Sequence, residues 1–461
     1  MGEYRIIYIL CVAFFATIAG LLFGFDTAII SGSLKFILSD LNIDKENFVL
    51  QEFIVSSVPI GAFLGAIFSR LSSDVIGRKK SIAITSILFS LGTLIAVSSN
   101  SIKTVIIGRL IMGLGVGLSS MIVPMYLSEI SPIKIRGALV FCYQLAVTMG
   151  LLVAFITNYV FSDSGSWKCM FLIGLFPSLI LLVGTFILPE SPRWLVIKNK
   201  FCEAKEVLKL LMKNNTLIKK QLIDIKSSNL TRSNLICLFR KPISTITILC
   251  ILMFAFQQLS GINVIMYYAP TIYQQAGFSN TKHQLLAALL NGVVFVLSTA
   301  FGTWIVDKIG RRKLFITGSM GMFICLVILS LLFGNLISFI TNDIKMFMAI
   351  FAILGHIIFF AISLGPLPYL IMSELFPLRM KDWGMSIASC SNWGFNVLVS
   401  STFLSLVNLF TISYTFLFYA FFIFFGLLFC YFFMPETKGV SLEQIERNIL
   451  NNRKIRFIGS L

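Results

Sequence analysis

Charged residues are scarce in this 461-residue chain. They make up 12% of the sequence, whereas hydrophobic residues make up 57%, and the mean hydropathy is +0.91. This number of charged residues is too small to cover the surface of an ordinary water-soluble domain. The composition therefore excludes a soluble protein and indicates a multi-pass membrane protein.

Residues that hold metals or build disulfides are also few or poorly spaced. The two histidines are too few for a metal cluster, and no zinc-ligand spacing occurs. The nine cysteines show no paired spacing, and those in apolar runs, such as Cys250 and Cys430, are interpreted as small packing residues. No nucleophile–base pair or phosphate-binding loop is visible. We therefore expect no metal, no cofactor and no catalytic residues, and a membrane enzyme is the weakest alternative.

Acidic residues are outnumbered by basic ones, 20 to 37, which gives a net charge of +17. Such an excess is typical of nucleic-acid binding, but its distribution argues against that partner. If both termini are cytosolic, Arg109 falls within a helix and the outer side carries only six basic residues, namely Lys35, Lys45, Lys103, Lys168, Lys282 and Lys345. All the others lie at cytosolic ends, loops or tails, which is the positive-inside bias. The sequence thus predicts an integral protein of the cell membrane, inner or plasma, in contact with the lipid bilayer and with both termini cytosolic; a monomer is expected to suffice.

Long apolar runs are abundant. Each is about 20 residues or more, enough to cross a bilayer as a helix. The first run continues too far, and carries too many polar residues, for a separate cleavable leader. We count twelve runs, at 7–34, 51–73, 80–99, 103–127, 137–160, 168–188, 243–273, 284–306, 313–337, 346–372, 383–407 and 411–433.

Three short motifs occur twice, in the same order and at a nearly constant offset. The pattern D-x-I-G-R-[KR]-K begins at Asp74 and again at Asp307, and a Ser-Glu pair before proline recurs at Glu129 and Glu374. The third motif is Pro-Glu, ending at Glu190 and at Glu436. This indicates duplication of a six-helix unit into parallel repeats.

The duplication and the one long polar stretch predict the domain organisation. The fold is expected to be all-α, with two six-helix bundles related by a pseudo-twofold axis. The expected parts are an N-terminal bundle over 1–188, a cytosolic linker with short helices over 189–242, a C-terminal bundle over 243–434 and a cytosolic tail over 435–461.

Amide side chains gather in the seventh run. Gln257, Gln258 and Asn263 lack water inside a bilayer and need partners from the protein or from a ligand. A break at Gly261 would turn all three toward one cavity. Amides and aromatic rings suit a neutral polyhydroxylated ligand, and the alternative is a network of hydrogen bonds between helices. The element Gly365-Pro366-Leu367-Pro368 predicts a second break at mid-membrane, with a cavity or hinge.

Two opposite charges are expected to meet inside the membrane. Asp26 lies in the outer third of the first run and Arg109 in the outer third of the fourth. A carboxylate at mid-bilayer costs ~2.5–3.5 kcal/mol on insertion scales, so a partner is needed. The pair is either a static ion pair or a protonatable switch, because burial disfavours the charged carboxylate while the guanidinium favours it.

Taken together, the motifs of this chain resemble those of the sugar porter family of the major facilitator superfamily, over nearly the whole length. They are Phe23-Gly24-Phe25-Asp26, the paired D-x-x-G-R segments, Gly108-Arg109, Glu129-x-x-Pro132-x-x-x-Arg136-Gly137, Pro189-Glu190-Ser191-Pro192-Arg193-Trp194, Gln257-Gln258-x-x-Gly261-x-Asn263, Gly365-Pro366-x-Pro368, Asn392-Trp393 and Pro435-Glu436-Thr437-Lys438-Gly439.

The resemblance implies the twelve-helix major facilitator fold with one central sugar site. The family's sugar-contacting residues fall on Gln144, Gln257, Gln258, Asn263 and Asn392, with Phe23, Tyr267 and Trp393 nearby. Tyr369 stands where the family usually has tryptophan, and it is also expected to bind the substrate. Phe295 stands where the family has an asparagine, and Asn291 lies one turn earlier.

The resemblance also implies transport of a monosaccharide, a hexose or a pentose, by alternating access. An aspartate facing the helix-4 arginine is the pattern of proton-coupled members, so Asp26 and Arg109 favour proton symport. A facilitative uniporter remains an alternative, as does a non-transporting sugar sensor, although such sensors often carry a long signalling tail. Eight charged residues are expected to form a cytosolic gate that pairs between helices when the protein opens outward, namely Arg78, Glu129, Arg136, Glu190, Arg311, Arg312, Glu374 and Glu436.

Overall fold

The structure of the chain is a computed structural model. It describes residues 4–44, 46–132, 135–228, 235–334, 341–377, 380–438, 440, 442–451 and 453–459. Within these ranges the regular elements are helices, and an isolated bridge joins Tyr4 to Met212. The predicted all-α class is confirmed.

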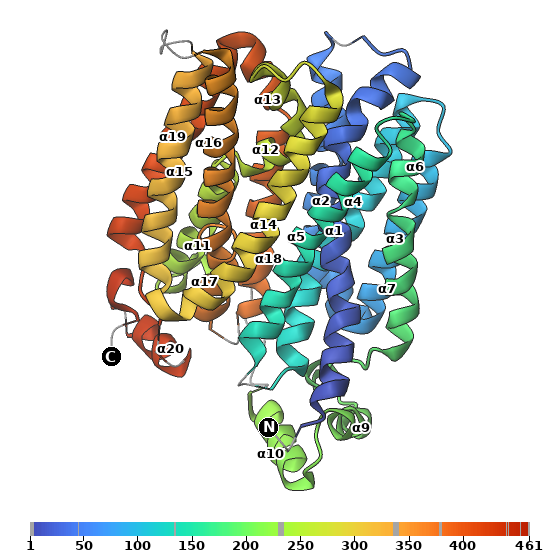
Figure 1. Cartoon of the computed structure of the whole chain (residues 1–461). Coiled ribbons are helices and arrows are strands. Elements are labelled where there is room, and N and C mark those ends of the chain that lie inside the picture. Colours follow the sequence, from blue (N-terminus) through green and yellow to red (C-terminus); the bar gives the residue numbers. More distant parts are fainter. Residues whose placement is uncertain are drawn as a thin grey trace.

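The first half of the chain forms one group of packed helices (Figure 1). Within it α2 and α3 both pack on α4, while α1 packs on α5 and α7. These helices are α1 (Ile6–Asp40), α2 (Phe48–Ile76), α3 (Arg78–Val97), α4 (Ile102–Ile130), α5 (Arg136–Val160), α6 (Trp167–Leu172) and α7 (Leu175–Ile187).

The second half forms a matching group, in which α15 packs on α16 and α19 and α11 packs on α18. The two groups meet along two seams, α2 against α18 and α5 against α14. The helices of this second group are α11 (Ile243–Gln258), α12 (Ile262–Tyr267), α13 (Ala269–Gln275), α14 (Thr281–Ile309), α15 (Arg311–Phe333), α16 (Asn342–Ile362), α17 (Leu367–Leu375), α18 (Lys381–Ser400) and α19 (Phe403–Phe433).

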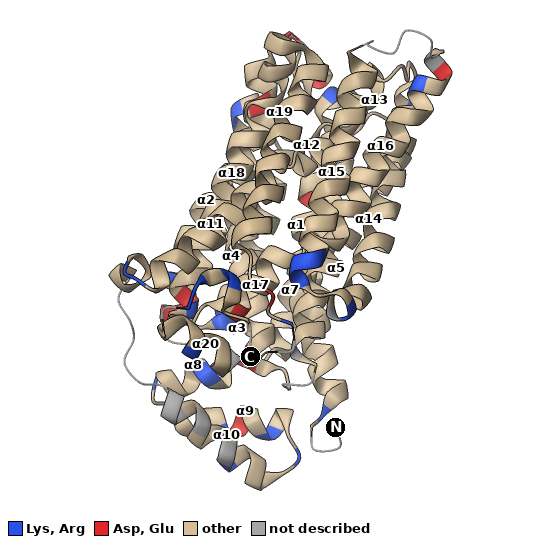
Figure 2. Ribbon diagram, turned by 90° about the vertical axis from the view of Figure 1, so that its left-hand side faces the viewer, with Lys and Arg blue, Asp and Glu red and all other residues tan. Residues whose placement is uncertain are grey.

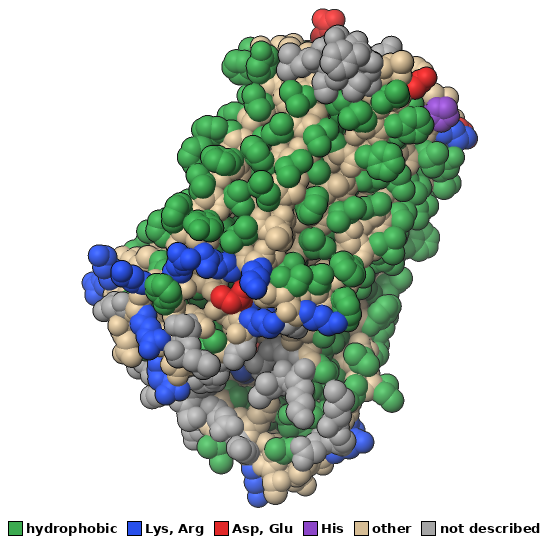
Figure 3. Space-filling view, turned by 60° about the vertical axis from the view of Figure 1, so that its left-hand side comes forward, with side chains coloured by type: hydrophobic (Ala, Val, Ile, Leu, Met, Phe, Trp, Pro, Cys, Tyr) green, Lys and Arg blue, Asp and Glu red, His purple; other side chains and the backbone are tan. Residues whose placement is uncertain are grey.

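Short helices cover one end of the molecule, where both termini also lie (Figure 1). Most Lys and Arg residues gather toward this end (Figure 2), and a broad apolar face rises above them (Figure 3). The short helices are α8 (Pro192–Ile197), α9 (Phe201–Leu211), α10 (Asn215–Ser228) and η1 (Leu235–Phe239) between the bundles, and α20 (Leu442–Leu450) and η2 (Ile455–Phe457) in the tail.

In the described part of the chain, eleven helices, some of them broken, are long and apolar enough to cross a membrane. The remaining predicted run, 383–407, corresponds mainly to α18, whose amides and serines lower its hydropathy below that of the others. The last two runs are separated within α19, where Thr411 has φ 71° and ψ 159°. With α18 included, the twelve predicted runs are accounted for.

Helices α1 and α5 approach each other at glycines. A Cβ added at Gly24 would lie 1.8 Å from the carbonyl oxygen of Val147, and one at Gly150 would lie 2.0 Å from that of Leu21. No larger residue fits either position, so the two backbones touch. This contact fixes the part of α1 that carries Phe23 and Asp26.

Both predicted helix breaks are confirmed. Gly261 has a left-handed conformation, φ 77°, and separates α11 from α12. The second break separates α16 from α17 and leaves the carbonyl groups of Leu364 and Gly365 outside the regular helix ladder. Backbone groups freed in this way need partners inside a membrane.

Gly261→Ala should destabilise the protein by ~1–2 kcal/mol, because an L-residue is strained at positive φ and its Cβ would lie 3.2 Å from the Tyr419 ring. The melting temperature of the purified protein in detergent measures this effect. Gly137→Ala is the matched control, since an added Cβ meets nothing within 4 Å there. Equal melting temperatures for the two variants would contradict the strain argument.

Candidate functional site

A hollow of about 570 Å³ lies where the two bundles face each other. Its wall combines amides with aromatic and aliphatic side chains from both halves of the chain. The lining residues are Phe23, Thr27, Gln144, Val147, Leu151, Gln257, Gln258, Ile262, Asn263, Met266, Phe295, Phe360, Gly365, Tyr369, Asn392 and Asn396.

Four of these side chains form one hydrogen-bonded chain. Asn263 Nδ2 donates to Gln258 Oε1, and Gln258 Nε2 donates to Asn392 Oδ1. Asn392 Nδ2 in turn donates to the Tyr369 hydroxyl at 2.7 Å. The break at Gly261 allows this, because it brings Asn263 onto the same side as Gln258. The sequence left two interpretations of these amides open, a network of hydrogen bonds between helices and a polar wall that faces a cavity. The structure contains both.

Gln257 connects the two helix breaks. Its Nε2 donates to the carbonyl oxygens of Leu364 at 2.7 Å and Gly365 at 2.9 Å. Its Oε1 is buried and has no hydrogen-bond partner among the described residues. An unsatisfied buried acceptor is unfavourable by about 1–3 kcal/mol, so this oxygen is available for a donor inside the hollow.

Aromatic rings shape the rest of the wall. Tyr369 packs edge-on against Phe254, with ring centroids 4.9 Å apart, and Phe295 packs against Phe360 at 6.0 Å. Phe295 therefore gives the hollow an apolar wall at this position. Asn291, one turn earlier, faces elsewhere and accepts a 2.7 Å hydrogen bond from the Tyr273 hydroxyl.

Trp393 and Tyr267 lie behind the lining rather than on it. The Trp393 ring is 5.1 Å from that of Phe23, and its Nε1 donates to Ser120 Oγ on α4 at 3.1 Å. The hydroxyl of Tyr267 donates to Asn396, a lining residue, at 3.4 Å. In this arrangement both residues reach the hollow through a neighbour, Phe23 for Trp393 and Asn396 for Tyr267.

Asp26 and Arg109 meet as expected, both fully buried. Their closest atoms, Asp26 Oδ1 and Arg109 Nη1, are 3.7 Å apart. Arg109 Nε also donates to the carbonyl of Ile54 and to Ser57 Oγ on α2. Neither carboxylate oxygen of Asp26 has a hydrogen-bond partner in the described part of the protein. The carboxyl is thus held by the charge of Arg109, and Asp26 is followed in α1 by Thr27, which lines the hollow.

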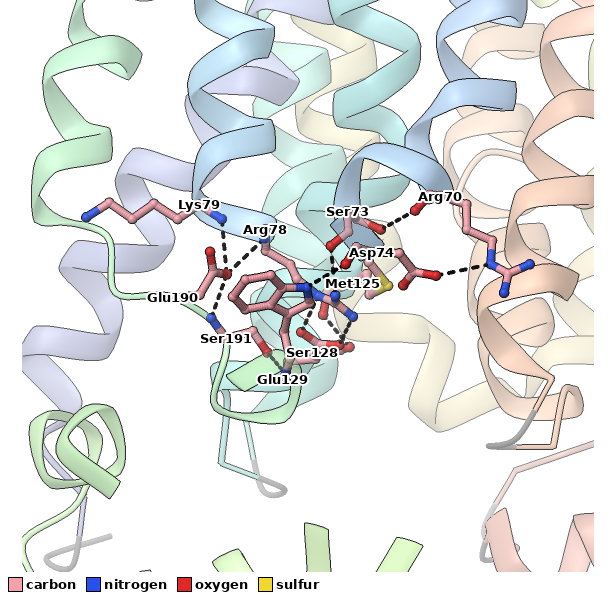
Figure 4. Close-up of polar contacts among 11 residues, drawn as sticks. Arg70, Ser73, Asp74, Arg78, Lys79, Met125, Ser128, Glu129, Glu190 and Ser191 are labelled. Atoms are coloured by element: carbon pink, nitrogen blue, oxygen red, sulfur yellow. Dashed lines mark hydrogen bonds and ion pairs between the residues drawn. The ribbon is translucent and has the colours of Figure 1, made fainter. Parts of the chain in front are cut away.

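The charged motifs form a dense network at the end of the N-terminal bundle that carries the termini (Figure 4). Arg78 makes two hydrogen bonds to the Glu129 carboxylate, at 3.0 and 3.1 Å. Glu190 Oε1 accepts from the backbone N–H groups of Arg78, Lys79 and Ser191 at 2.9–3.2 Å. Burial raises the pKa of the Glu190 carboxyl above its ordinary value, and these donors oppose that shift.

The same network recurs in the C-terminal bundle. Arg311 Nη2 lies 3.1 Å from Glu374 Oε1, and Glu436 accepts from the backbone N–H groups of Arg311 and Arg312 at 3.0 and 3.1 Å. The matched geometry supports the duplication predicted from the sequence. Each network pairs helices within its own bundle; the side chain of Arg136 lies outside the described residues.

Other contacts cross between the bundles. At the end that carries the termini, the Arg70 guanidinium lies 3.1 Å from the centre of the Trp383 ring, which joins α2 to α18. At the opposite end Lys282 pairs with Asp163 at 2.8 Å, and Glu52 accepts from the N–H and hydroxyl of Ser405, both at 2.7 Å. Polar contacts therefore join the two bundles at the end remote from the termini.

Comparison with known proteins identifies the family. The family described as "Sugar (and other) transporter" matches residues 12–449. The chain belongs to this sugar transporter family. It is accordingly a membrane transporter and not an enzyme.

The sugar transporter family includes close relatives of known activity. The chain is 37% identical to the galactose-proton symporter of Escherichia coli strain K12 over 97% of its own length and 96% of the relative. It is 34% identical to the arabinose-proton symporter of the same strain, over 96% and 94% of the two chains. It is 36% identical to the D-xylose transporter of Levilactobacillus brevis, over 95% of each.

Solved structures in the sugar transporter family share the fold. The proton:xylose symporter XylE bound to 6-bromo-6-deoxy-D-glucose aligns with a TM-score of 0.82 and 30% identity, over 97% of this chain and all of that one. A partially occluded inward-open form of the xylose transporter XylE from E. coli aligns with a TM-score of 0.81 and 30% identity, over 94% and 99%. The major facilitator fold predicted from the sequence is confirmed.

Of the residues that the sequence proposes for substrate binding in this sugar transporter, seven line the hollow, namely Phe23, Gln144, Gln257, Gln258, Asn263, Tyr369 and Asn392. Sequence analysis missed Thr27 and Asn396. Asn396 lies one helical turn after Asn392, and residues at that spacing share a helix face, so the sequence did contain a signal for Asn396. Thr27 carries no comparable signal of its own.

The Arg70–Trp383 contact should contribute about 0.5–1 kcal/mol, as a cation held over an aromatic face. In a double-mutant cycle, Arg70→Ala and Trp383→Ala should show a coupling of that size in the free energy of unfolding. The control cycle combines Arg70→Ala with Trp304→Ala, because the Trp304 ring is covered by Lys308 instead. If the changes in the free energy of unfolding from Arg70→Ala and Trp383→Ala simply added in the double variant, the contact would be ruled out.

Proposed function

We propose that this protein moves a monosaccharide, a hexose or a pentose, across the membrane by proton symport with alternating access. The supporting observation is the amide-lined hollow between the bundles, in which Gln257 Oε1 has no hydrogen-bond partner among the described residues. Thr27, which also lines the hollow, directly follows Asp26 in α1. The galactose-, arabinose- and xylose-transporting relatives support the substrate class.

The wall chemistry suits an uncharged sugar. Each hydroxyl group can donate to one amide oxygen and accept from another amide nitrogen, replacing the bonds that join Asn263, Gln258 and Asn392. A net ~0.5–1.5 kcal/mol per hydrogen bond over several bonds gives ~4–7 kcal/mol. That corresponds to roughly millimolar to ten-micromolar affinity, which is weak enough for release.

Proton coupling follows from a difference between the two residues of the buried ion pair, namely how many other partners each one has. Arg109 keeps hydrogen bonds to α2 whether or not Asp26 is charged, whereas Asp26 has only the charge of Arg109 to hold it. A proton on Asp26 therefore removes the charge attraction that joins α1 to α4 at this point. Because α1 also carries Phe23 and Thr27, this change reaches the hollow directly.

The two bundles, 1–188 and 243–434, then rock about the hollow, joined by the linker 189–242 and followed by the tail 435–461. The end with the termini and most basic residues faces the cytosol, as the positive-inside bias requires. Arg78, Glu129 and Glu190, with Arg311, Arg312, Glu374 and Glu436, and Arg136 from the sequence motif, form the cytosolic gate. The transporter works as a monomer in the cell membrane, inner or plasma.

Gln144→Ala should weaken sugar binding about threefold to tenfold, the loss of one hydrogen bond. The melting temperature should stay unchanged, because Gln144 lines the hollow without joining the amide chain. Gln257→Ala should lower both affinity and melting temperature, because it also leaves the carbonyl groups of Leu364 and Gly365 unpaired. Labelled-sugar binding and thermal unfolding of the same preparations separate these effects, and wild-type binding by both variants would exclude the hollow as the site.

Asp26→Asn should abolish uphill sugar accumulation and spare sugar exchange across the membrane, since the neutral amide imitates the protonated carboxyl. The measurement is uptake into proteoliposomes of a panel of labelled hexoses and pentoses, with and without a proton gradient. Unchanged proton-driven accumulation in the variant would show that Asp26 is not the proton carrier.

The same assay separates the alternatives. A facilitative uniporter would equilibrate the sugar without responding to the proton gradient. A sugar sensor would bind sugar without moving it.

A further inference from the structure

A second hollow, of about 600 Å³, lies at the cytosolic end of the C-terminal bundle, apart from the sugar site. One wall is the start of α11, with Lys241, Pro242, Thr245 and Ile246. The other wall is the tail around η2, and it consists of Ile449, Arg453, Lys454, Ile455 and Ile458.

The two ends of this hollow differ in chemistry. Its floor is apolar: the buried side chains of Ile246, Ile449 and Ile458 line it, and Ile455 beside them is partly exposed. Its rim is cationic, because Lys241 and Lys454 are exposed beside Arg453. Among the described residues that line the hollow, none is acidic.

The hollow also lies at the level of a membrane surface. Lys241 comes just before the membrane-crossing segment that starts at Ile243. On the side that bears α19 and α20, Lys and Arg residues form a belt directly below the apolar face (Figure 3). This belt is where the phosphate groups of the cytosolic lipid leaflet would lie.

We infer that this hollow is a binding site for one anionic phospholipid, with the headgroup phosphate between Lys241 and Lys454 and the glycerol and upper acyl chain on the isoleucine floor. A free phosphate ion matches the rim but leaves the floor without a partner. A zwitterionic lipid matches the floor but brings a choline cation to a cationic rim.

A lipid bound there would hold the tail in place beside the gate. Asn448 Nδ2 donates to the carbonyl of Ile458 at 2.8 Å, which folds the tail back on α20. At Gly459 an added Cβ would lie 1.7 Å from the carbonyl oxygen of Glu436, so the tail backbone packs directly on the residue that binds the start of α15. The headgroup site thus connects the lipid leaflet to the C-terminal half of the cytosolic gate.

The test uses the full-length protein in a mild detergent and follows its melting temperature against added lipid. Dioctanoyl phosphatidylglycerol should raise the melting temperature saturably, whereas dioctanoyl phosphatidylcholine and inorganic phosphate at equal concentrations should not. Lys241→Gln with Lys454→Gln should shift the phosphatidylglycerol midpoint about thirtyfold higher, from the attraction of an anionic headgroup to each basic side chain. Arg453 stays unchanged because it also interacts elsewhere in the chain.

Two further variants make the result decisive. Lys205→Gln with Lys219→Gln removes the same charge from exposed positions on α9 and α10 and should keep the unsubstituted midpoint. Lys241→Arg with Lys454→Arg should restore it. An equal shift in both glutamine pairs, or an equal response to phosphatidylcholine or inorganic phosphate, would overturn the proposal. The readout requires no sugar transport, so it stands or falls independently of the proposed function.

Discussion

The two hydrogen bonds from Gln257 to the carbonyl groups of Leu364 and Gly365 are the interaction on which the central hollow depends. A helix cannot be broken inside a membrane unless the freed backbone groups find partners, because lipid offers none. The break between α16 and α17 supplies two free carbonyl groups, and the intact end of α11 supplies the amide that binds them. One side chain therefore holds two irregular segments together and keeps its oxygen free on the hollow.

Charges are used in two different ways in this molecule. Those at the end that carries the termini are paired closely, as in the Arg78–Glu129 contact at 3.0 Å, with backbone donors satisfying the remaining carboxylates. The buried pair at Asp26 is longer, 3.7 Å, and its carboxylate oxygens have no hydrogen-bond donor within the described ranges. Charged groups with several hydrogen bonds stabilise one arrangement of the helices. A carboxylate with a single electrostatic partner instead becomes protonated at a low cost in free energy. This contrast separates the proposed gate from the proposed proton site.

The amides of the hollow show how one set of residues can be stable with and without a ligand. Asn263, Gln258, Asn392 and Tyr369 bind one another in sequence, so these side chains satisfy much of each other's hydrogen-bonding capacity. A sugar would exchange these bonds for others of similar strength, which keeps net affinity modest. Phe295 and Phe360 leave one wall apolar, so the polar contacts come mainly from α5, α11, α12 and α18.

Much of the fold was predictable because lipid restricts what a membrane chain can do. The length of the apolar runs, the repeated Asp-Gly-Arg, Glu and Pro-Glu motifs and the breaks at Gly261 and Pro366 follow from local chemistry, so the sequence by itself determined the helices, their duplication and the residue types available for a site. Only the tertiary structure decided which of these residues share a surface. In it Asn396 and Thr27 line the hollow, whereas Asn291 faces elsewhere and Trp393 lies behind Phe23. Lys454 of the tail lines the same second hollow as Lys241. These outcomes depend on helix rotation and on contacts between segments far apart in the chain, and no local pattern encodes either.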